Sequence, residues 1–396
     1  MTATGPIHLT RPFSGYPALV FARTALRSAA FVGAQPSASV AAAGSELVIG
    51  AAAGTSEHEV RVRARAELIE RMSNIVAGRR AEGTGHWDCF SRLTRQGLPA
   101  MDPREWAELA ETPGIRERPM LWVPGVSLTH GGEVLVPACA VYLRHRPGDG
   151  SPALMSPGSA GLSAHRSVEL ARQHALLEVL ERDLFWRAWY SDGPRAVIDA
   201  ATLRAELGRL GLRRTTLLLA GPRGCACIVV CLYEPNRSRQ SFGARAIRCT
   251  DEAAVTDATR TATHEALMVR WSLDTPSARA AAGDPAGRAS PAGPLQHALH
   301  TFHRQDSLGH LLTHHAPSVP CDTGDAELAN VVAAHTGHDV VWVDTVAHSD
   351  ELDRATADSP LAVGRVVAPG ARRLPANEAR IPTPLKPKNQ LPHPLG

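Results

Sequence analysis

The stretch SAGLSAHRSVELARQHALLEVLERD, residues 159–183, decides the fold prediction. It opens with small residues, and Ser167 then stands where a helix N-cap is expected, because a Ser side chain accepts the free N–H groups of a first turn. From there to about Tyr190 no Gly or Pro occurs. The stretch therefore predicts one long helix, with the tag Glu-x-x-Glu-Arg at residues 178–182.

The same tag occurs once more, about a hundred residues upstream. Residues 56–76, SEHEVRVRARAELIERMSNIV, also lack Gly and Pro, and Ser56 with Glu59 has the spacing of a capping box. A second helix is predicted there. In each tag two glutamates three residues apart lie on one helical face, Glu67 with Glu70 and Glu178 with Glu181.

Around these helices, short apolar and β-branched runs predict strands, and the fold class is therefore mixed α/β or α+β. Strands are expected at 121–128, 133–144, 216–221, 225–233, 241–249, 339–346 and 362–369. A third helix is expected at 251–271, and a loop at 276–294.

Composition excludes several functional classes. The net charge of +3 is too small to make nucleic acid an expected partner, and no apolar run is long enough for a membrane helix. The first residues lack the pattern of a secretory signal, so we expect a cytoplasmic protein. Seven cysteines in such a chain are expected to be reduced thiols.

The two lysines of the chain, Lys386 and Lys388, lie close to its end. A phosphate-binding GxxxxGK[ST] loop, a kinase strand lysine and a buried Schiff-base lysine are thereby excluded. An enzyme of this sequence that uses ATP has to bind the phosphates in another way.

Several familiar signatures are incomplete. Met268 stands where a zinc-protease helix needs its second His, and His165 replaces the last Gly of a nucleophile elbow. Two groups of residues could either bind a metal or simply pack in the ordinary way: three thiols on one strand face, and two histidines one helical turn apart. They are Cys225, Cys227 and Cys231, and His310 with His314.

The paired glutamates admit two interpretations. Glu67 with Arg71, and Glu178 with Arg182, can form surface ion pairs at i,i+4, each worth a few tenths of a kcal/mol. However, the apolar run around Phe185 and Trp189 places this helix next to a core. Four carboxylates converging there would need a cation, and hard oxygen ligands suit Mg²⁺.

Several motifs in order resemble the YcaO family. Residues 159–183 are similar to its Ser-Asn-Gly-Leu-Ala helix with Glu-x-x-Glu-Arg, and GTSEHEVRVRARAELIERMS is similar to its first ATP motif. FGARAIRCTDEAAVTDATRTATHEALMVR resembles the third motif, and RVVAPGA, residues 365–371, its late Arg-x-x-x-Pro-Gly strand end. Four positions depart from the pattern, namely Arg63, Ala160, His174 and Met268, and Ala53 stands where a Lys is frequent in the family.

The resemblance implies a YcaO-like fold and an enzyme that uses ATP and Mg²⁺. It assigns four glutamates to the metal: Glu67, Glu70, Glu178 and Glu181. It assigns five residues to the nucleotide: Arg71, Ser159, Arg182, Glu265 and Arg270. It implies an N-terminal segment at 1–44, a catalytic domain at 45–376 and a Pro-rich tail at 377–396.

The implied reaction is the cyclodehydration of a ribosomally made precursor peptide, as in the biosynthesis of thiazole- and oxazole-containing antibiotics such as thiopeptides. A Cys, Ser or Thr side chain adds to the preceding amide, ATP phosphorylates the amide oxygen, and a thiazoline or oxazoline ring forms. The implied partners are the precursor peptide, a ThiF-like leader-binding protein, a flavin dehydrogenase and a second copy of the chain. A separate leader-binding protein is expected because the residues before 45 leave no room for such a domain.

Two other functions remain open on the sequence. A member of this family can admit an external nucleophile and form a thioamide or an amidine. A chain with four departures can also be a non-catalytic scaffold that binds peptide and partner enzymes.

The tail, IPTPLKPKNQLPHPLG, has two interpretations as well. Composition alone is typical of a disordered end. LPHPLG, however, resembles the Pro-x-Pro end of azoline-forming family members, which returns to the active site. That resemblance assigns a catalytic role to His393, Pro394 and Gly396.

Overall fold

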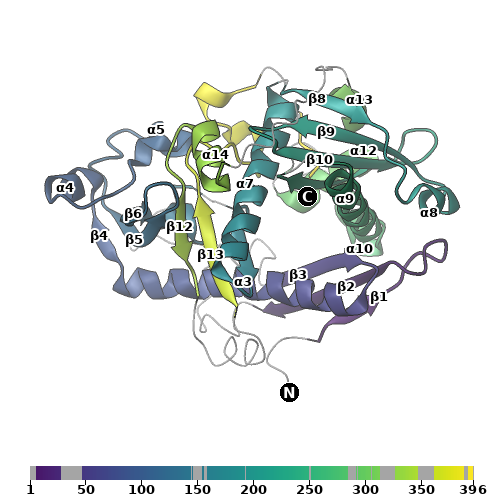
Figure 1. Ribbon diagram of the computed structural model, residues 1–396, viewed down its shortest axis with the longest axis horizontal. Coiled ribbons are helices and arrows are strands. Elements are labelled where there is room, and N and C mark those ends of the chain that lie inside the picture. Colours follow the sequence, from purple (N-terminus) through teal and green to yellow (C-terminus); the bar gives the residue numbers. More distant parts are fainter. Residues whose placement is uncertain are drawn as a thin grey trace.

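The computed structural model describes residues 6–27, 47–143, 145, 154–155, 158–191, 193–248, 251–283, 291, 293–304, 306–312, 326–346, 361–387 and 391–395. Three antiparallel sheets and three helices of more than twenty residues organise these parts of the chain (Figure 1). The mixed α/β class predicted from the sequence is confirmed.

The first sheet has the order β1 (His8–Thr10), β2 (Val20–Arg27), β3 (Leu47–Gly54). Helix α3 (Glu57–Thr84) follows it and packs on it. The predicted cap is present, since the Ser56 side chain accepts a hydrogen bond from Glu59 N. The predicted division at residue 44 lies outside the described residues.

The second sheet has the order β4 (His86–Asp88), β5 (Met120–Ser127), β12 (Val341–Asp344), β13 (Ala362–Val367), β7 (Leu162–His165), and β6 (Glu133–Pro137) pairs with β5. Short helices flank it: α4 (Phe90–Arg95), α5 (Ala107–Ala110), α6 (Ala138–Val141) and α14 (Leu328–Thr336).

The third sheet has the order β11 (Ser241–Ile247), β10 (Ala226–Tyr233), β9 (Arg213–Ala220), β8 (Arg195–Ile198). Helix α9 (Glu252–Leu273) packs on β11 and β10. The remaining helices are α8 (Arg204–Arg209), α10 (Pro276–Gly283), α12 (Pro294–Arg304) and α13 (Ser307–Leu312).

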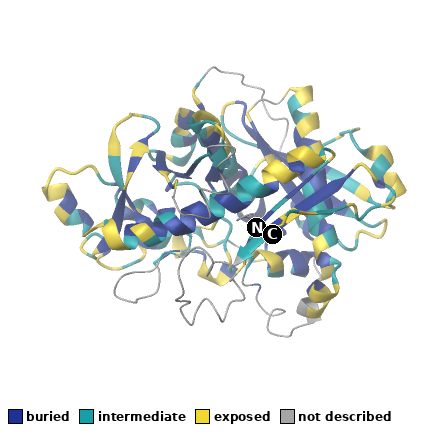
Figure 2. Ribbon diagram, turned by 90° about the horizontal axis from the view of Figure 1, so that it is seen from below, coloured by how far each residue is buried: buried dark blue, intermediate teal, exposed yellow. Residues whose placement is uncertain are grey.

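Helix α7 (Val168–Tyr190) stands between the second and third sheets, with α3 passing beneath it (Figure 1). Its first half packs Leu176 and Leu180 in one apolar cluster with Trp342. Its second half packs Phe185 and Trp189 in another cluster, which includes strands of the third sheet. In Figure 2 the buried residues gather on the strands and on the inner faces of the helices. Both predicted termini of α7 are confirmed, with Ser167 as its N-cap.

Three local predictions need correction. The strand expected at 133–144 ends at Pro137, which lacks a donor N–H, and one turn of helix follows as α6. The loop expected at 276–294 begins with helix α10, because Pro276 suits a first helical turn and alanines follow it. The three thiols do not gather, since Cys225 packs in a different cluster from Cys227 and Cys231.

Glycine allows α9 to lie directly on its strand. A Cβ on Gly243 of β11 would overlap the carbonyl oxygen of Ala262 and lie 2.9 Å from Ala266 N. A Cβ on Gly50 of β3 would meet α3 in the same way, at Ala64 O and 2.7 Å from Leu68 N. Both contacts are with backbone atoms, which cannot rotate away.

We therefore expect Gly243→Ala to lower the free energy of unfolding by about 1–3 kcal/mol through overpacking. Gly83→Ala in α3 is the matched control, because a Cβ added at Gly83 would have no atom within 4 Å and Ala favours a helix. Urea denaturation of both variants measures the difference. Equal stability of the two would contradict the close packing of α9 on β11.

Candidate active site

Three sheet edges meet at the predicted site. Strands β3, β7 and β11 are each the last strand of their sheet, so each has one row of backbone groups without a neighbouring strand. Glutamates take the N–H groups of these edges. The four hydrogen bonds are Ala51 N to Glu67 Oε2 (2.7 Å), Gly161 N to Glu178 Oε2 (3.2 Å), Ala244 N to Glu265 Oε2 (3.1 Å) and Ala246 N to Glu181 Oε2 (3.1 Å).

Three of these glutamates occupy the same position in a repeated strand–helix unit. Each follows the pattern Ala-x-x-Glu on a helix and accepts a hydrogen bond from the strand or turn that precedes that helix. The patterns are Ala64-x-x-Glu67 on α3, Ala175-x-x-Glu178 on α7 and Ala262-x-x-Glu265 on α9. The Glu-x-x-Glu-Arg tags are thus parts of a threefold local repeat, whose third copy has Met268 in place of the second glutamate.

The carboxylates are close enough to repel one another. Burial, followed by the charges of Glu178 and Glu67, raises the pKa of Glu70 well above its usual value. Burial raises the pKa of Glu178 to about 7, with Arg182 opposing and Glu181 adding to the rise. The α3 and α7 pairs therefore face one another.

Glu265 belongs to the same cluster. Burial and the charge of Glu181 raise its pKa to about 7. Five glutamates from α3, α7 and α9 thus share one region of low polarity, and each additional ionised carboxylate is disfavoured by those already present.

Two of the predicted arginines lie beside these carboxylates. Arg71 is 2.5 Å from Glu67 and donates to Ile49 O at 2.7 Å. Arg182 is 3.5 Å from Glu181. The i,i+4 pair of Glu67 with Arg71 is present as the local interpretation predicted, but it lies within the cluster and not on an open surface.

A buried arginine to which the sequence assigned no role supports the turn at Ser159. Arg365 of β13 is 2% exposed and donates to Val141 O, Gly158 O and Ala160 O at 2.7–2.9 Å. The turn that it holds contains Ser159 and ends at Gly161, the donor to Glu178. The late RVVAPGA stretch is the sequence signal for this residue.

Two further arginines border the cluster. Arg245 is exposed and lies between Ala244 and Ala246, the two donors of β11. Arg63 of α3 donates to Ala53 O, and its pKa is lowered by burial and by the charge of Arg245. In the sequence, Arg63 stands out only as a departure from the family pattern.

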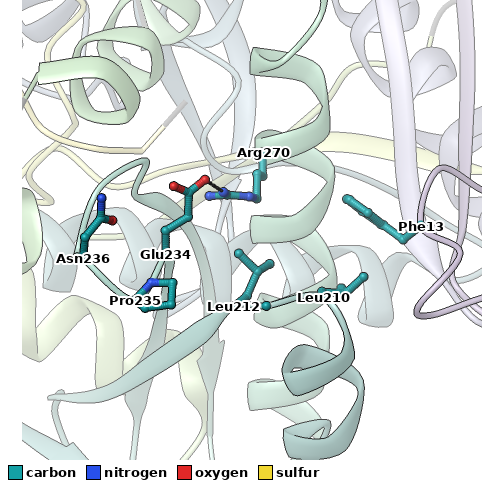
Figure 3. A pocket seen from close by; sticks show the side chains of 8 residues that line it. Phe13, Leu210, Leu212, Glu234, Pro235, Asn236 and Arg270 are labelled. Carbon is teal, nitrogen blue, oxygen red and sulfur yellow. Dashed lines mark hydrogen bonds and ion pairs between the residues drawn. The ribbon is translucent and has the colours of Figure 1, made fainter.

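Arg270 lies elsewhere on α9. It donates to Glu234 Oε1 at 2.8 Å and also to Arg239 O, and it lines a pocket of about 460 Å³ with Phe13 and Leu212 (Figure 3). Neither of these hydrogen bonds involves a carboxylate of the cluster. The assignment of Arg270 to the nucleotide stays a prediction.

The tail is ordered where it is described, at residues 391–395. Leu395 is 3% exposed and packs with Phe185 of α7, and Trp189 Nε1 donates to Leu391 O at 2.9 Å. The interpretation of these residues as a disordered end is therefore wrong. Gly396 lies outside the described residues, and Pro394 is buried.

His393 lies inside this packed tail. Its Nε2 is 3.0 Å from Pro375 O, its backbone N donates to Glu378, and its ring stacks on His297. Burial lowers its pKa to about 3, and the charges of His297 and Arg182 contribute. The tail thus brings a neutral imidazole within electrostatic reach of Arg182.

His297, Glu378 and His393 also have the composition of a metal site, with ligand atoms within 4.8 Å of one another. However, the two imidazole rings lie 4.1 Å apart at an angle of only 17°. Lone pairs in the planes of two stacked rings cannot converge on one ion. This cluster therefore anchors the tail through hydrogen bonds, together with Tyr190, whose hydroxyl donates to Glu378 at 2.8 Å.

The candidate site at His310 and His314 stays a prediction, because only His310 is described. His310 Nε2 lies 3.0 Å from Trp189 O, and His314 falls outside the described residues. Within the described ranges, none of the helices has the length and apolar character that a membrane crossing requires.

Comparison with known proteins decides the family. The family description "YcaO cyclodehydratase, ATP- and Mg²⁺-binding" matches residues 51–372. The chain belongs to the YcaO family. Membership confirms the predictions of a YcaO enzyme with ATP and Mg²⁺ as its cofactors.

Solved structures of YcaO proteins share the fold. YcaO from Methanopyrus kandleri, bound with AMPPCP and Mg²⁺, has a TM-score of 0.59 and 20% identity, over 98% of this chain and 90% of that one. A heterocyclase in complex with substrate and cofactor has a TM-score of 0.66 and 16% identity, over 93% of this chain and 50% of that one. The E. coli microcin synthetase McbBCD complex with pro-MccB17 bound has a TM-score of 0.62 and 12% identity, over 92% of this chain and 87% of that one.

A curated relative matches a smaller part. An uncharacterized protein of Methanothermobacter thermautotrophicus is 34% identical over 80 residues, which is 20% of this chain and 21% of the relative. The chain therefore matches about a fifth of that relative and half of the heterocyclase.

The cluster fits Mg²⁺ and ATP on its own chemistry. Burial, together with repulsion between neighbouring carboxylates, raises the pKa values of Glu70, Glu178 and Glu265, so a cation at the cluster would stabilise their ionised forms. Divalent cations with oxygen preference would supply that charge. The nearby Arg63, Arg71, Arg182 and Arg245 offer guanidinium groups to phosphates in place of a lysine.

The raised pKa values carry a prediction for stability. The pKa of the Glu178 carboxyl is raised from 4.5 to about 7 in the folded protein. Between these two pH values the group keeps its proton in the folded protein and loses it in the unfolded chain. Without metal, stability is therefore expected to fall as the pH rises from about 5 to above 7. Glu178→Gln removes this repulsion and is expected to be more stable than the wild type at pH 8, by about 1–3 kcal/mol.

Mg²⁺ should reverse the order of stability of the wild type and Glu178→Gln. Adding Mg²⁺ with a nucleotide at pH 8 is expected to stabilise the wild type and to stabilise Glu178→Gln much less. Thermal or urea unfolding at pH 5 and pH 8, with and without Mg²⁺ and AMPPCP, measures both effects. A wild-type stability that is independent of pH in this range would refute the clustering of the carboxylates.

Proposed function

We propose that this chain is an ATP- and Mg²⁺-dependent cyclodehydratase that converts Cys, Ser or Thr residues of a ribosomally synthesised peptide into thiazoline or oxazoline rings. The observation that carries the proposal is the cluster of five glutamates from three helices, four of which accept hydrogen bonds from the three sheet edges. A lapsed site would gain stability by losing these charges, and all five are present.

In this function Glu67, Glu70, Glu178 and Glu181 hold the metal. Glu265 lies beside Glu181 and completes the acidic wall. When bound, ATP supplies the phosphoryl group that turns a peptide amide oxygen into a leaving group.

The arginines act on the phosphates. Arg71 and Arg182 are already oriented by Glu67 and Glu181, so little side-chain entropy is lost when they bind an anion. Arg63 and Arg245 come from the opposite elements, α3 and β11, and can contribute two more guanidinium groups. Ser159 and Arg270 stay candidate nucleotide ligands.

The peptide has to be held where its amide meets these groups. We propose that a leader-binding partner presents it, and a homodimer and a flavin dehydrogenase that oxidises the rings belong to the same hypothesis. The proposal is supported by the E. coli microcin synthetase McbBCD complex, which includes a protein of similar fold and has been solved with pro-MccB17 bound.

The decisive experiment combines the purified chain, its partner and a candidate precursor peptide with ATP and Mg²⁺. We expect release of ADP and loss of one water mass per ring, and Glu181→Gln should abolish both because a metal-facing charge is removed. Arg213→Gln, at an exposed position on β9, is the control. An intact peptide mass with wild-type enzyme would contradict cyclodehydration, and exchange of oxygen for sulfur would favour the thioamide function.

The tail gives a second test. His393 Nδ1 is buried and makes no hydrogen bond among the described residues, so its lone pair is available. At a pKa of about 3 the imidazole is a weak base, and proton transfer to it requires that a bound substrate raise this pKa. We expect His393→Ala to stop ring formation, while Mg²⁺-AMPPCP binding stays intact. Leu391→Ala changes an exposed side chain of the same tail and should keep activity. Full ring formation by His393→Ala would remove the tail from the mechanism.

A further inference from the structure

A second, smaller cavity lies beside the carboxylates. Its volume is about 30 Å³, and its lining includes Val179 and Arg182 of α7, which adjoin Glu178 and Glu181 in sequence. Residues from β13 and the segment that follows it form the opposite side, and Ala160 of the turn before β7 also contributes. The cavity thus borders the proposed catalytic site.

Four arginines line this cavity: Arg182, Arg365, Arg372 and Arg373. The rest of its wall is almost entirely apolar, with Trp106, Ala140 and Val366 among its members. Low-polarity walls strengthen the field of the guanidinium groups within the cavity. Among the described residues, the lining contains no acidic side chain.

The four arginines differ in their partners. Arg365 donates to the backbone carbonyls of Val141, Gly158 and Ala160. Arg372 lies over the ring of Trp186, at 5.8 Å from its centre. Two carboxylates, Glu181 and Glu108, pair with Arg182 and Arg373 at 3.5 and 3.2 Å.

Arg373 Nη2 has an ionic partner but no hydrogen bond. This buried atom lies 3.2 Å from a carboxylate oxygen of Glu108, and within the described residues no group accepts a hydrogen bond from it. Burial and the charge of Arg373 also lower the pKa of Arg365 to about 9, while the charges of Glu178 and Glu70 act in the opposite direction. A small anion in the cavity would offer Arg373 Nη2 an acceptor and would reduce the repulsion between these two arginines.

We propose that the four-arginine cavity binds inorganic phosphate. This inference rests on the proposed function, in which the amide oxygen leaves the peptide as part of inorganic phosphate. A space of this size holds about two water molecules, which suits a small oxyanion and excludes a nucleotide or a peptide segment. Several guanidinium groups match the oxygens of a tetrahedral anion better than those of a planar carboxylate.

The four-arginine cavity would receive the phosphate product after it forms. Phosphate that forms at the carboxylates can pass to the arginines without crossing bulk solvent, since Arg182 borders both places. High phosphate concentrations should therefore occupy the cavity from outside and slow turnover as product inhibition.

The test is a calorimetric titration of the full chain with inorganic phosphate, in the absence of nucleotide. We expect one saturable site in the wild type, and an affinity about tenfold to a hundredfold lower in Arg372→Gln and in Arg373→Gln, through the loss of a charge-assisted hydrogen bond. Arg213→Gln removes the same charge from an exposed position of β9 and should bind phosphate like the wild type.

Three results would overturn the proposal: no saturable phosphate binding by the wild type, equal affinity in both cavity variants and the wild type, or acetate binding as tight as that of phosphate. Binding of Mg²⁺-AMPPCP by the same variants is expected to stay within about twofold of the wild type. Phosphate that competes with AMPPCP would assign the arginines to the nucleotide site instead. A failure to consume ATP would refute the proposed function and leave the phosphate titration as an independent result.

Discussion

The structure depends on how three unpaired sheet edges are satisfied at one place. The edge N–H groups of β3, of β11 and of the turn before β7 all need acceptors, and carboxylates from α3, α7 and α9 provide them. Each carboxylate has two oxygens, so one bond to the backbone leaves further lone pairs for a cation. The same side chains therefore close the fold and form the acidic site, at the expense of mutual repulsion.

Much of this arrangement could be predicted from the sequence because its causes are local. Caps at Ser56 and Ser167 depend on spacing within one turn, and the helices that they start contain no breaking residue near the tags. The repeated Glu-x-x-Glu-Arg tag required only helical periodicity to place its glutamates on one face. The order of the motifs then led to the YcaO family, which the match over residues 51–372 shows.

What could not be predicted depends on contacts between distant segments. The bonds from Ala244 and Ala246 to glutamates of two different helices require knowledge of which strand ends its sheet. The burial of His393 follows from the docking of Leu395 against α7, whereas its proline-rich surroundings alone are typical of a free end. Arg270 has a carboxylate partner, Glu234, that lies 36 residues away in the chain.

Helix α7 has a consequence for communication within the molecule. It contacts β13 and β7 of one sheet and β11, β10 and β9 of another, and its last turns support the tail. A rigid rod held in this way cannot shift at one end without moving Glu178 and Glu181 at its middle. A protein that docks on either sheet, or a peptide that pulls on the tail, would thus displace the proposed metal ligands by moving a single helix.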